Sequence, residues 1–253
     1  MGGETYLNGC QASASNPQDR ISCSDLLRRE GTLAQGPNHE GGRLNPLCYN
    51  RRMPDAKSRA KKIKLFLFDV DGVLTDGKLF FVPTRPGESR GPGELNLTSQ
   101  GSIEVKGFHA HDGVAISLAR VAGIKTGLIT KRSSETVAVR ARDLKLNHIC
   151  QGIQDKLGAF REILAQEKLT AAEACFVGDD VIDLPVMWNC GFAVAVANAR
   201  DEVKKDAHFV TKRRGGDGAL RDAVEFILKS QGRLKKVVAE YTGYRGPETA
   251  GDQ

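Results

Sequence analysis

Two carboxylates separated by one residue form the motif with the clearest capacity for chemistry. Asp69 and Asp71 are followed by Gly72 and come directly after an apolar run at residues 63–68. A carboxylate can attack an electrophile or bind a cation, and a second one beside it can donate and accept protons. Taken alone, the pair also fits a solvated turn or a loose cation site, so its role depends on the other motifs.

Two single polar residues stand at comparable places. Thr130 follows the apolar run at residues 124–129, where its hydroxyl could bind a phosphate oxygen or cap a helix. Lys156 opens a helical segment, where its charge opposes the helix dipole and gains little from a purely structural role. Each residue by itself is more often structural than functional.

A cluster of three carboxylates follows the apolar run at residues 174–177. Asp179, Asp180 and Asp183 lie within five positions of one another. Such a concentration of negative charge is costly unless a cation lies among the carboxylates. This cluster is the strongest single indication of a metal site.

The segments that position these motifs alternate between strand length and helical spacing. Strands are expected at 63–68, 124–129, 174–177 and 192–196, and helices at 114–121, 135–144, 157–167 and 219–228. Short apolar runs alternating with amphipathic helices predict an α/β domain with a doubly wound parallel sheet. Such sheets bind ligands at the carboxyl ends of their strands, which is where all of these motifs fall.

The segment between the first strand and the helix near residue 112 has strand-like ends and a centre rich in Pro, Gly and Ser. It predicts a small β-hairpin flap at 78–108 and leaves no room for a large cap domain. Residues 1–60 lack periodicity and are expected to be a disordered extension, with the domain at 61–230. Residues 231–253 are expected to form a C-terminal helix and tail.

Composition excludes several classes of function. The formal net charge is +6, but residues 1–62 hold ten Lys/Arg against six Asp/Glu, which leaves about +2 for the rest. The dense basic stretch at 57–62 contains no aromatic residue, so we expect no nucleic-acid partner. No apolar run is long enough to span a bilayer or resembles a signal peptide, which predicts a cytoplasmic protein. The six cysteines form no C-x-x-C pair, so reduced thiols are expected.

The order of the motifs resembles a known superfamily. DVDG, a Thr after a strand, a Lys at a helix start and GDDxxD resemble the four motifs of the haloacid dehalogenase superfamily. The segments FDVDGVLTDG, FHAHDGVAI, ITKR, QGIQDK, VGDDVIDLPVM and GGDGALRDA resemble the 3-deoxy-D-manno-octulosonate 8-phosphate phosphatase family. This second resemblance implies a role in lipopolysaccharide biosynthesis and a homotetramer in which hairpins and C-terminal tails of neighbouring subunits close the site.

The resemblance also implies a role for each motif residue. Asp69 would be the nucleophile and a ligand of Mg²⁺, and Asp179 would complete the protein ligands. Asp71 would be the acid/base, contact the substrate and bind the metal through its backbone carbonyl. Thr130 and Lys156 would hold the phosphoryl oxygens. A second group, Asp180 and Asp183, would orient the metal ligands or the lysine rather than bind the ion directly.

Recognition of the substrate is expected from a loop and two arginines. By resemblance, the substrate-binding residues are His109, Ala110, His111, Asp112, Gly113, Arg132 and Arg140, together with Asp71 and Lys156. Guanidinium groups suit the carboxylate or phosphate of a sugar acid phosphate, although Arg140 also fits the polar face of a helix. The chain departs from the family pattern at three positions, because His111 and Ser117 replace basic residues and Lys131 replaces a glycine.

Three functions are therefore open. The favoured one is magnesium-dependent hydrolysis of 3-deoxy-D-manno-octulosonate 8-phosphate through an aspartyl phosphate. The second is hydrolysis of a related ulosonate 9-phosphate or another sugar phosphate. The third, of another class, is a non-catalytic module that binds phosphate without turnover.

Overall fold

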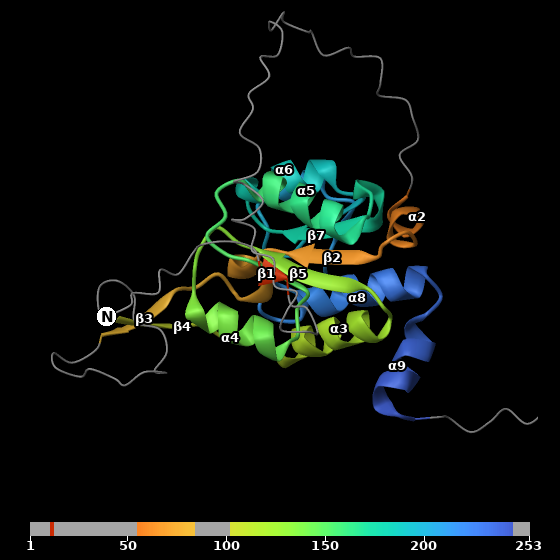
Figure 1. Ribbon diagram of the computed structural model, residues 1–253, viewed down its shortest axis with the longest axis horizontal. Coiled ribbons are helices and arrows are strands. Elements are labelled where there is room, and N and C mark those ends of the chain that lie inside the picture. Colours follow the sequence, from red (N-terminus) through yellow and green to blue (C-terminus); the bar gives the residue numbers. More distant parts are fainter. Residues whose placement is uncertain (1–10, 13–54, 84–101, 245–253) are drawn as a thin grey trace, which may run out of the picture.

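The computed structural model describes residues 11–12, 55–83 and 102–244. In this part of the chain, a seven-stranded sheet has the order β1-β6-β5-β2-β7-β8-β9 (Figure 1). The six strands from β6 to β9 are parallel, and only β1 runs antiparallel to its neighbour. The strands are β1 Gln11–Ala12, β2 Leu65–Phe68, β5 Lys125–Ile129, β6 His148–Cys150, β7 Ala174–Gly178, β8 Phe192–Ala195 and β9 Phe209–Val210.

Helices cover both faces of this sheet, with α3 and α8 on one face and α5 and α6 on the other (Figure 1). The helices are α2 Ala56–Ala60, α3 Ala110–Val121, α4 Glu135–Asp143, α5 Lys156–Glu167, α6 Leu184–Asn189, α7 Asp201–Asp206, α8 Ala219–Ser230 and α9 Leu234–Thr242. The predicted doubly wound α/β fold is confirmed. Within the described residues, no helix combines the length and the apolar character needed to cross a membrane.

Burial explains why these segments form these elements. All four residues of β2 and all five of β7 are buried, as expected for central strands covered on both faces. Helix α8 buries Leu220, Val224 and Ile227, which recur at helical spacing along the side that packs on the sheet. The buried sheet therefore supports the residues that follow its strands.

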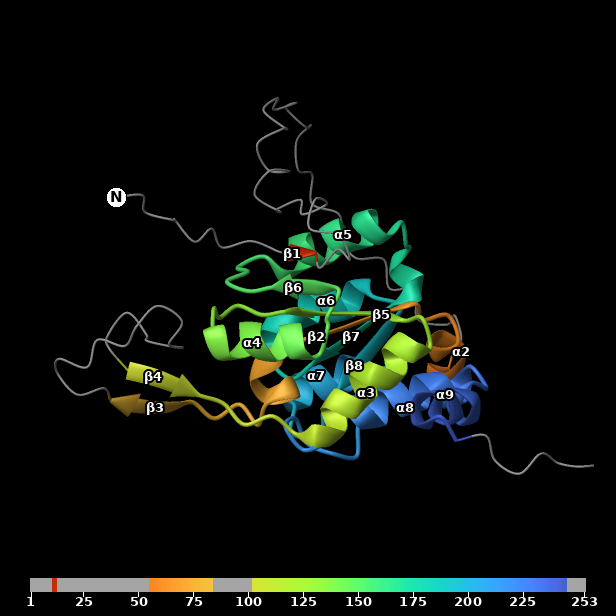
Figure 2. The same ribbon diagram turned by 60° about the horizontal axis from the view of Figure 1, so that its bottom comes forward.

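A two-stranded hairpin projects from the domain (Figure 2). Strand β3 Phe80–Pro83 pairs antiparallel with β4 Ser102–Val105, which confirms the predicted flap. Its tip lies outside the described residues. Several large apolar side chains around these strands are exposed, namely Leu79, Phe80, Phe81, Val82 and Val105.

Two expectations about the N-terminal region and the cysteines need correction. Helix α2 lies within the segment predicted to be disordered. The helix forms there because Asp55 caps it by accepting a hydrogen bond from Ser58 N (2.7 Å) and because Ala60 is buried in the core. Strand β1 also lies within residues 1–60, where it pairs with β6 at the edge of the sheet. Cys150 is disulfide-bonded, so reduced thiols were expected wrongly at this position. The thiols of Cys175 and Cys190 are free and buried, as predicted.

Candidate active site

The central strands bring three of the predicted residues to one edge of the sheet. Asp69 follows β2, Thr130 follows β5 and Asp179 follows β7. Because β5, β2 and β7 are parallel neighbours, their carboxyl ends lie side by side. The side chains of Asp69 and Thr130 are buried at this edge.

A buried lysine joins two carboxylates at the bottom of the site. Lys156 Nζ lies 2.7 Å from Asp69 Oδ2 and 2.8 Å from Asp183 Oδ1. Asp183 also accepts a hydrogen bond from Asp179 N (3.0 Å). Burial opposes the charge of Lys156, but the two carboxylates outweigh it and raise its pKa, so the lysine stays charged. Lys156 can therefore occupy the first position of α5, although its charge opposes the helix dipole, because Asp69 and Asp183 from other elements compensate that charge.

Three carboxylates are arranged as a possible metal site. Oxygen atoms of Asp69, Asp179 and Asp183 all lie within 4.8 Å of one another. Burial, followed by repulsion from Asp183, raises the pKa of Asp69 to about 6, and burial with repulsion from Asp183 and Asp69 raises that of Asp179 to about 8. A divalent cation would relieve this repulsion, and carboxylate oxygens are the ligands that hard cations prefer. The donor set therefore fits Mg²⁺.

These raised pKa values predict how metal-free protein responds to pH. A carboxyl whose pKa is higher in the folded than in the unfolded state stabilises the fold at low pH, and this contribution is lost as the pH rises through the folded pKa. We expect the free energy of unfolding of EDTA-treated protein to fall between about pH 6.5 and 8, by on the order of 1 to 2 kcal/mol. Chemical denaturation at the two pH values measures it.

Asp179→Asn is the comparison for this prediction, because it removes the group with the pKa near 8. The fall should be smaller in this variant, and Mg²⁺ should also reduce it in the wild type. A wild-type protein that becomes more stable over this range, with Asp179→Asn behaving identically, would contradict the arrangement.

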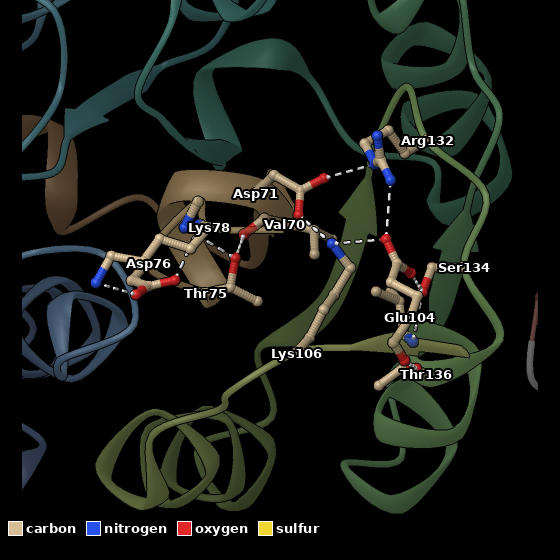
Figure 3. A network of polar contacts seen from close by, with 12 residues as sticks. Val70, Asp71, Thr75, Asp76, Lys78, Glu104, Lys106, Arg132, Ser134 and Thr136 are labelled. Carbon is tan, nitrogen blue, oxygen red and sulfur yellow. Dashed lines mark hydrogen bonds and ion pairs between the residues drawn. The ribbon is translucent and has the colours of Figure 1, made fainter. Parts of the chain in front are cut away.

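The second carboxylate of the first motif lies in a different network (Figure 3). Asp71 Oδ1 contacts Lys106 Nζ, and Asp71 Oδ2 lies 3.4 Å from Arg132 Nε. Glu104 Oε1 accepts a hydrogen bond from Arg132 Nη2 (2.8 Å) and also lies 3.4 Å from Lys106 Nζ. Sequence analysis missed Glu104 and Lys106. The available signal was a pair of opposite charges two positions apart in a strand-like run, which places both on one face.

The turn that carries Asp71 is hydrogen-bonded to a loop from the C-terminal half of the chain. Gly72 adopts φ +87°, and a Cβ there would overlap the Asp179 carboxylate. Asn198 Nδ2 donates to Gly72 O (3.0 Å), and Asn198 Oδ1 accepts from Gly215 N (2.6 Å). A Cβ on Gly215 would overlap Gly72 O, so glycine allows the two loops to meet. Asn198 and Gly215 are thus further residues that shape the site.

The residues of the predicted substrate loop, 109–113, lie in different environments. Asp112 is fully buried and accepts hydrogen bonds from Gly218 N (3.1 Å) and Arg221 N (3.2 Å) at the start of α8, so its carboxylate serves the fold. His109 caps α3, whose first turn contains Ala110 and Gly113. His111 is exposed, and its Nδ1 lies 3.3 Å from Arg213 Nη1.

The remaining predicted residues also differ in environment. Arg132 is partly exposed beside Asp71. Arg140 packs with its guanidinium carbon 5.6 Å from the centre of the Phe108 ring, and its buried Nε has no hydrogen-bond partner. Asp180 is an exposed cap of the turn Val181–Asp183, whereas Asp183 turns inward to Lys156. Of these two carboxylates, only Asp183 belongs to the central cluster.

The parallel sheet, the strand-end carboxylates and the buried lysine define a haloacid dehalogenase-like hydrolase, and the family model with that description matches residues 123–221. The 3-deoxy-D-manno-octulosonate 8-phosphate phosphatase of Yersinia pestis is 35% identical over 188 residues, which are 74% of this chain and 91% of that protein. Its counterpart in Escherichia coli strain K12 is 34% identical over 187 residues, 74% and 90% of the two chains.

A solved structure agrees. The Moraxella catarrhalis 3-deoxy-D-manno-octulosonate 8-phosphate phosphatase, in complex with magnesium ion, phosphate ion and KDO molecule, is 32% identical with a TM-score of 0.64. The match covers 74% of this chain and 97% of that one. The chain belongs to the 3-deoxy-D-manno-octulosonate 8-phosphate phosphatase family, and it is a phosphoric monoester hydrolase.

Proposed function

We propose that the protein hydrolyses 3-deoxy-D-manno-octulosonate 8-phosphate, with Mg²⁺ as cofactor and Asp69 as the residue that accepts the phosphoryl group. The observation that carries this proposal is the buried contact between Lys156 and Asp69 inside the carboxylate cluster. A lysine at this place offsets the charge that builds up when an anionic nucleophile meets an anionic phosphate. The relatives' substrate supplies the particular sugar acid.

The contacts of Asp69 suit a nucleophile. Val70 N donates to Asp69 Oδ1 (2.7 Å), and Lys156 holds Oδ2, so the carboxylate has a fixed orientation. Attack by one oxygen on phosphorus forms an aspartyl phosphate as the bond to the sugar oxygen breaks. Mg²⁺, when bound by Asp69 and Asp179, would supply charge neutralisation at the phosphoryl oxygens. Asp183 positions Lys156 and lies close enough to serve the same ion.

Asp71 and Thr130 complete the reaction in this proposal. Asp71 donates a proton to the departing sugar oxygen and then accepts one from the water that hydrolyses the aspartyl phosphate. Its partly exposed carboxylate lies beside Arg132, whose guanidinium can bind the substrate's anionic group. Thr130, at the end of β5, offers a hydroxyl to a phosphoryl oxygen.

A second copy of the chain is the proposed partner. The exposed apolar side chains of the hairpin, among them Phe80 and Phe81, form a surface that a monomer gains nothing by exposing. Hairpins from neighbouring copies would bury this surface and cover the open site, in the tetramer that the family resemblance implies. A related ulosonate 9-phosphate is the alternative substrate, because His111 and Ser117 alter the family pattern.

Phosphate release from a panel of esters tests the proposal. The panel contains 3-deoxy-D-manno-octulosonate 8-phosphate, ulosonate 9-phosphates, hexose phosphates and nucleotides, each measured with Mg²⁺. We expect kcat/KM for the 8-phosphate to exceed the others by a hundredfold or more, or about 2.7 kcal/mol in transition-state binding. Equal rates across the panel would reject the assigned substrate, and no release from any ester would favour a non-catalytic binding module.

A further inference from the structure

A buried lysine from the hairpin holds the Asp71 carboxylate. Lys106 follows β4, and its side chain is 0% exposed. Its Nζ contacts Asp71 Oδ1 and lies 3.4 Å from Glu104 Oε1 (Figure 3). Because the lysine offers no surface to a bound substrate, it can influence the reaction only through its two carboxylate partners, and Asp71 is the one in the first motif.

Glu104 fixes this lysine and the returning strand of the hairpin to the domain. Its side chain is almost fully buried and accepts hydrogen bonds from Arg132 Nη2 (2.8 Å) and from the Ser134 hydroxyl. Its backbone carbonyl accepts from Thr136 Oγ1 (3.2 Å), beside the start of α4. Two carboxylates and two cations balance in charge, so each member depends on the others for compensation.

The two cations that contact Asp71 differ in how readily they can leave it. The Arg132 side chain is 43% exposed, and its Nε lies 3.4 Å from Asp71 Oδ2. An anionic substrate could draw this guanidinium away because it is accessible and its contact is long. Lys106 has no exposed surface and two carboxylate partners, so it stays with Oδ1. One oxygen of Asp71 would then be free while the other remains held.

We propose that Lys106, kept in place by Glu104, is a positioning residue for Asp71, and that Arg132 is the exchangeable contact that frees Asp71 Oδ2 when substrate binds. This inference rests on the proposed function, since it takes Asp71 as the acid/base. Because Lys106 directly follows β4, proton transfer by Asp71 would then depend on the position of β4. A displaced hairpin would leave the nucleophile intact but misplace the proton donor.

Leaving-group dependence tests this inference in the full-length protein with Mg²⁺. The probes are p-nitrophenyl phosphate, whose leaving group needs little protonation, and phenyl phosphate, whose leaving group needs more. Lys106→Met should raise the ratio of kcat/KM for p-nitrophenyl phosphate to kcat/KM for phenyl phosphate by about tenfold, because phenyl phosphate, with the poorer leaving group, loses more activity. Lys106→Arg should recover part of the wild-type ratio. Lys78→Met, which changes an exposed lysine near the other strand, should leave it unchanged.

A double variant separates positioning from general damage. If Lys106 acts through Asp71, Asp71→Asn with Lys106→Met should hydrolyse p-nitrophenyl phosphate no more slowly than Asp71→Asn alone. Independent losses that multiply would overturn the inference. If Lys106→Met does not fold, Glu104→Gln is measured instead, with the same rise in ratio expected.

The two levels of the account fail in different ways. Wild-type protein that releases no phosphate from 3-deoxy-D-manno-octulosonate 8-phosphate or from either aryl ester contradicts the proposed function and, with it, this inference. Active wild-type protein whose ratio is unchanged in folded Lys106→Met, or in Glu104→Gln where that variant replaces it, contradicts the positioning role alone.

Discussion

Asp69→Asn is expected to reduce turnover by at least about a hundredfold while the fold is retained. The amide is a poor nucleophile, and it also removes a negative charge from the cluster that Lys156 and Asp183 complete. Since Asn has nearly the same shape as Asp, the buried position can accept it with little change in packing. Steady-state phosphate release with Mg²⁺ measures the loss, and thermal unfolding checks the fold.

Asp201→Asn is the matched control for this variant, because Asp201 is a fully exposed carboxylate in the first turn of α7. Its turnover should equal that of the wild type. Residual activity of Asp69→Asn above about 1% of wild type, with the control unchanged, would show that another residue accepts the phosphoryl group.

Removal of the divalent cation is expected to have an effect of similar size. EDTA should bring turnover to about 1% or less, and added Mg²⁺ should restore it, because Asp69 and Asp179 would otherwise repel each other and the phosphate. Asp179→Asn should raise the Mg²⁺ concentration needed for half-maximal activity by tenfold or more, on the order of 1.4 kcal/mol. Titration of activity with Mg²⁺ measures both.

Glu202→Gln provides the control for the magnesium titration, since Glu202 is an exposed carboxylate on α7, outside the cluster. It should require the same Mg²⁺ concentration as the wild type. Turnover that is indifferent to EDTA, or an unchanged requirement in Asp179→Asn, would remove Asp179 from the metal site.

The ends of the central strands were predictable because local chemistry and global topology agree there. In each of β2, β5 and β7 the last residues are non-polar and a polar residue follows at once, and a parallel sheet brings such residues to one edge. Asp69, Thr130 and Asp179 could therefore be placed together from sequence. The long amphipathic helices could be predicted from their spacing for the same reason.

Short and polar elements could not be predicted. Strands β6 and β9 have three and two residues, too few for a periodic signal. Strand β6 also contains His148, which is buried because its Nε2 lies 2.8 Å from Glu167 Oε1 on α5. That contact depends on the folded arrangement of two elements and leaves no trace in local composition.

Contacts between distant segments separate residues that the motifs left equivalent. Asp180 and Asp183 have the same chemistry in sequence, but the turn between them directs only Asp183 to Lys156. Asp112 belongs to the expected substrate loop, yet it is buried at the start of α8. Likewise, the contact between Asp71 and Lys106 joins residues 35 positions apart across the hairpin.

Detection of the phosphoryl group on Asp69 tests the central claim most directly. Wild-type protein with Mg²⁺ is mixed with 3-deoxy-D-manno-octulosonate 8-phosphate, quenched in acid within the first turnover and digested for mass spectrometry. We predict that the peptide containing Asp69 gains the mass of one phosphoryl group, that fragmentation places it on Asp69, and that Asp69→Asn shows no such gain. Phosphate release without any modified peptide, or with the group on another residue, would contradict the account.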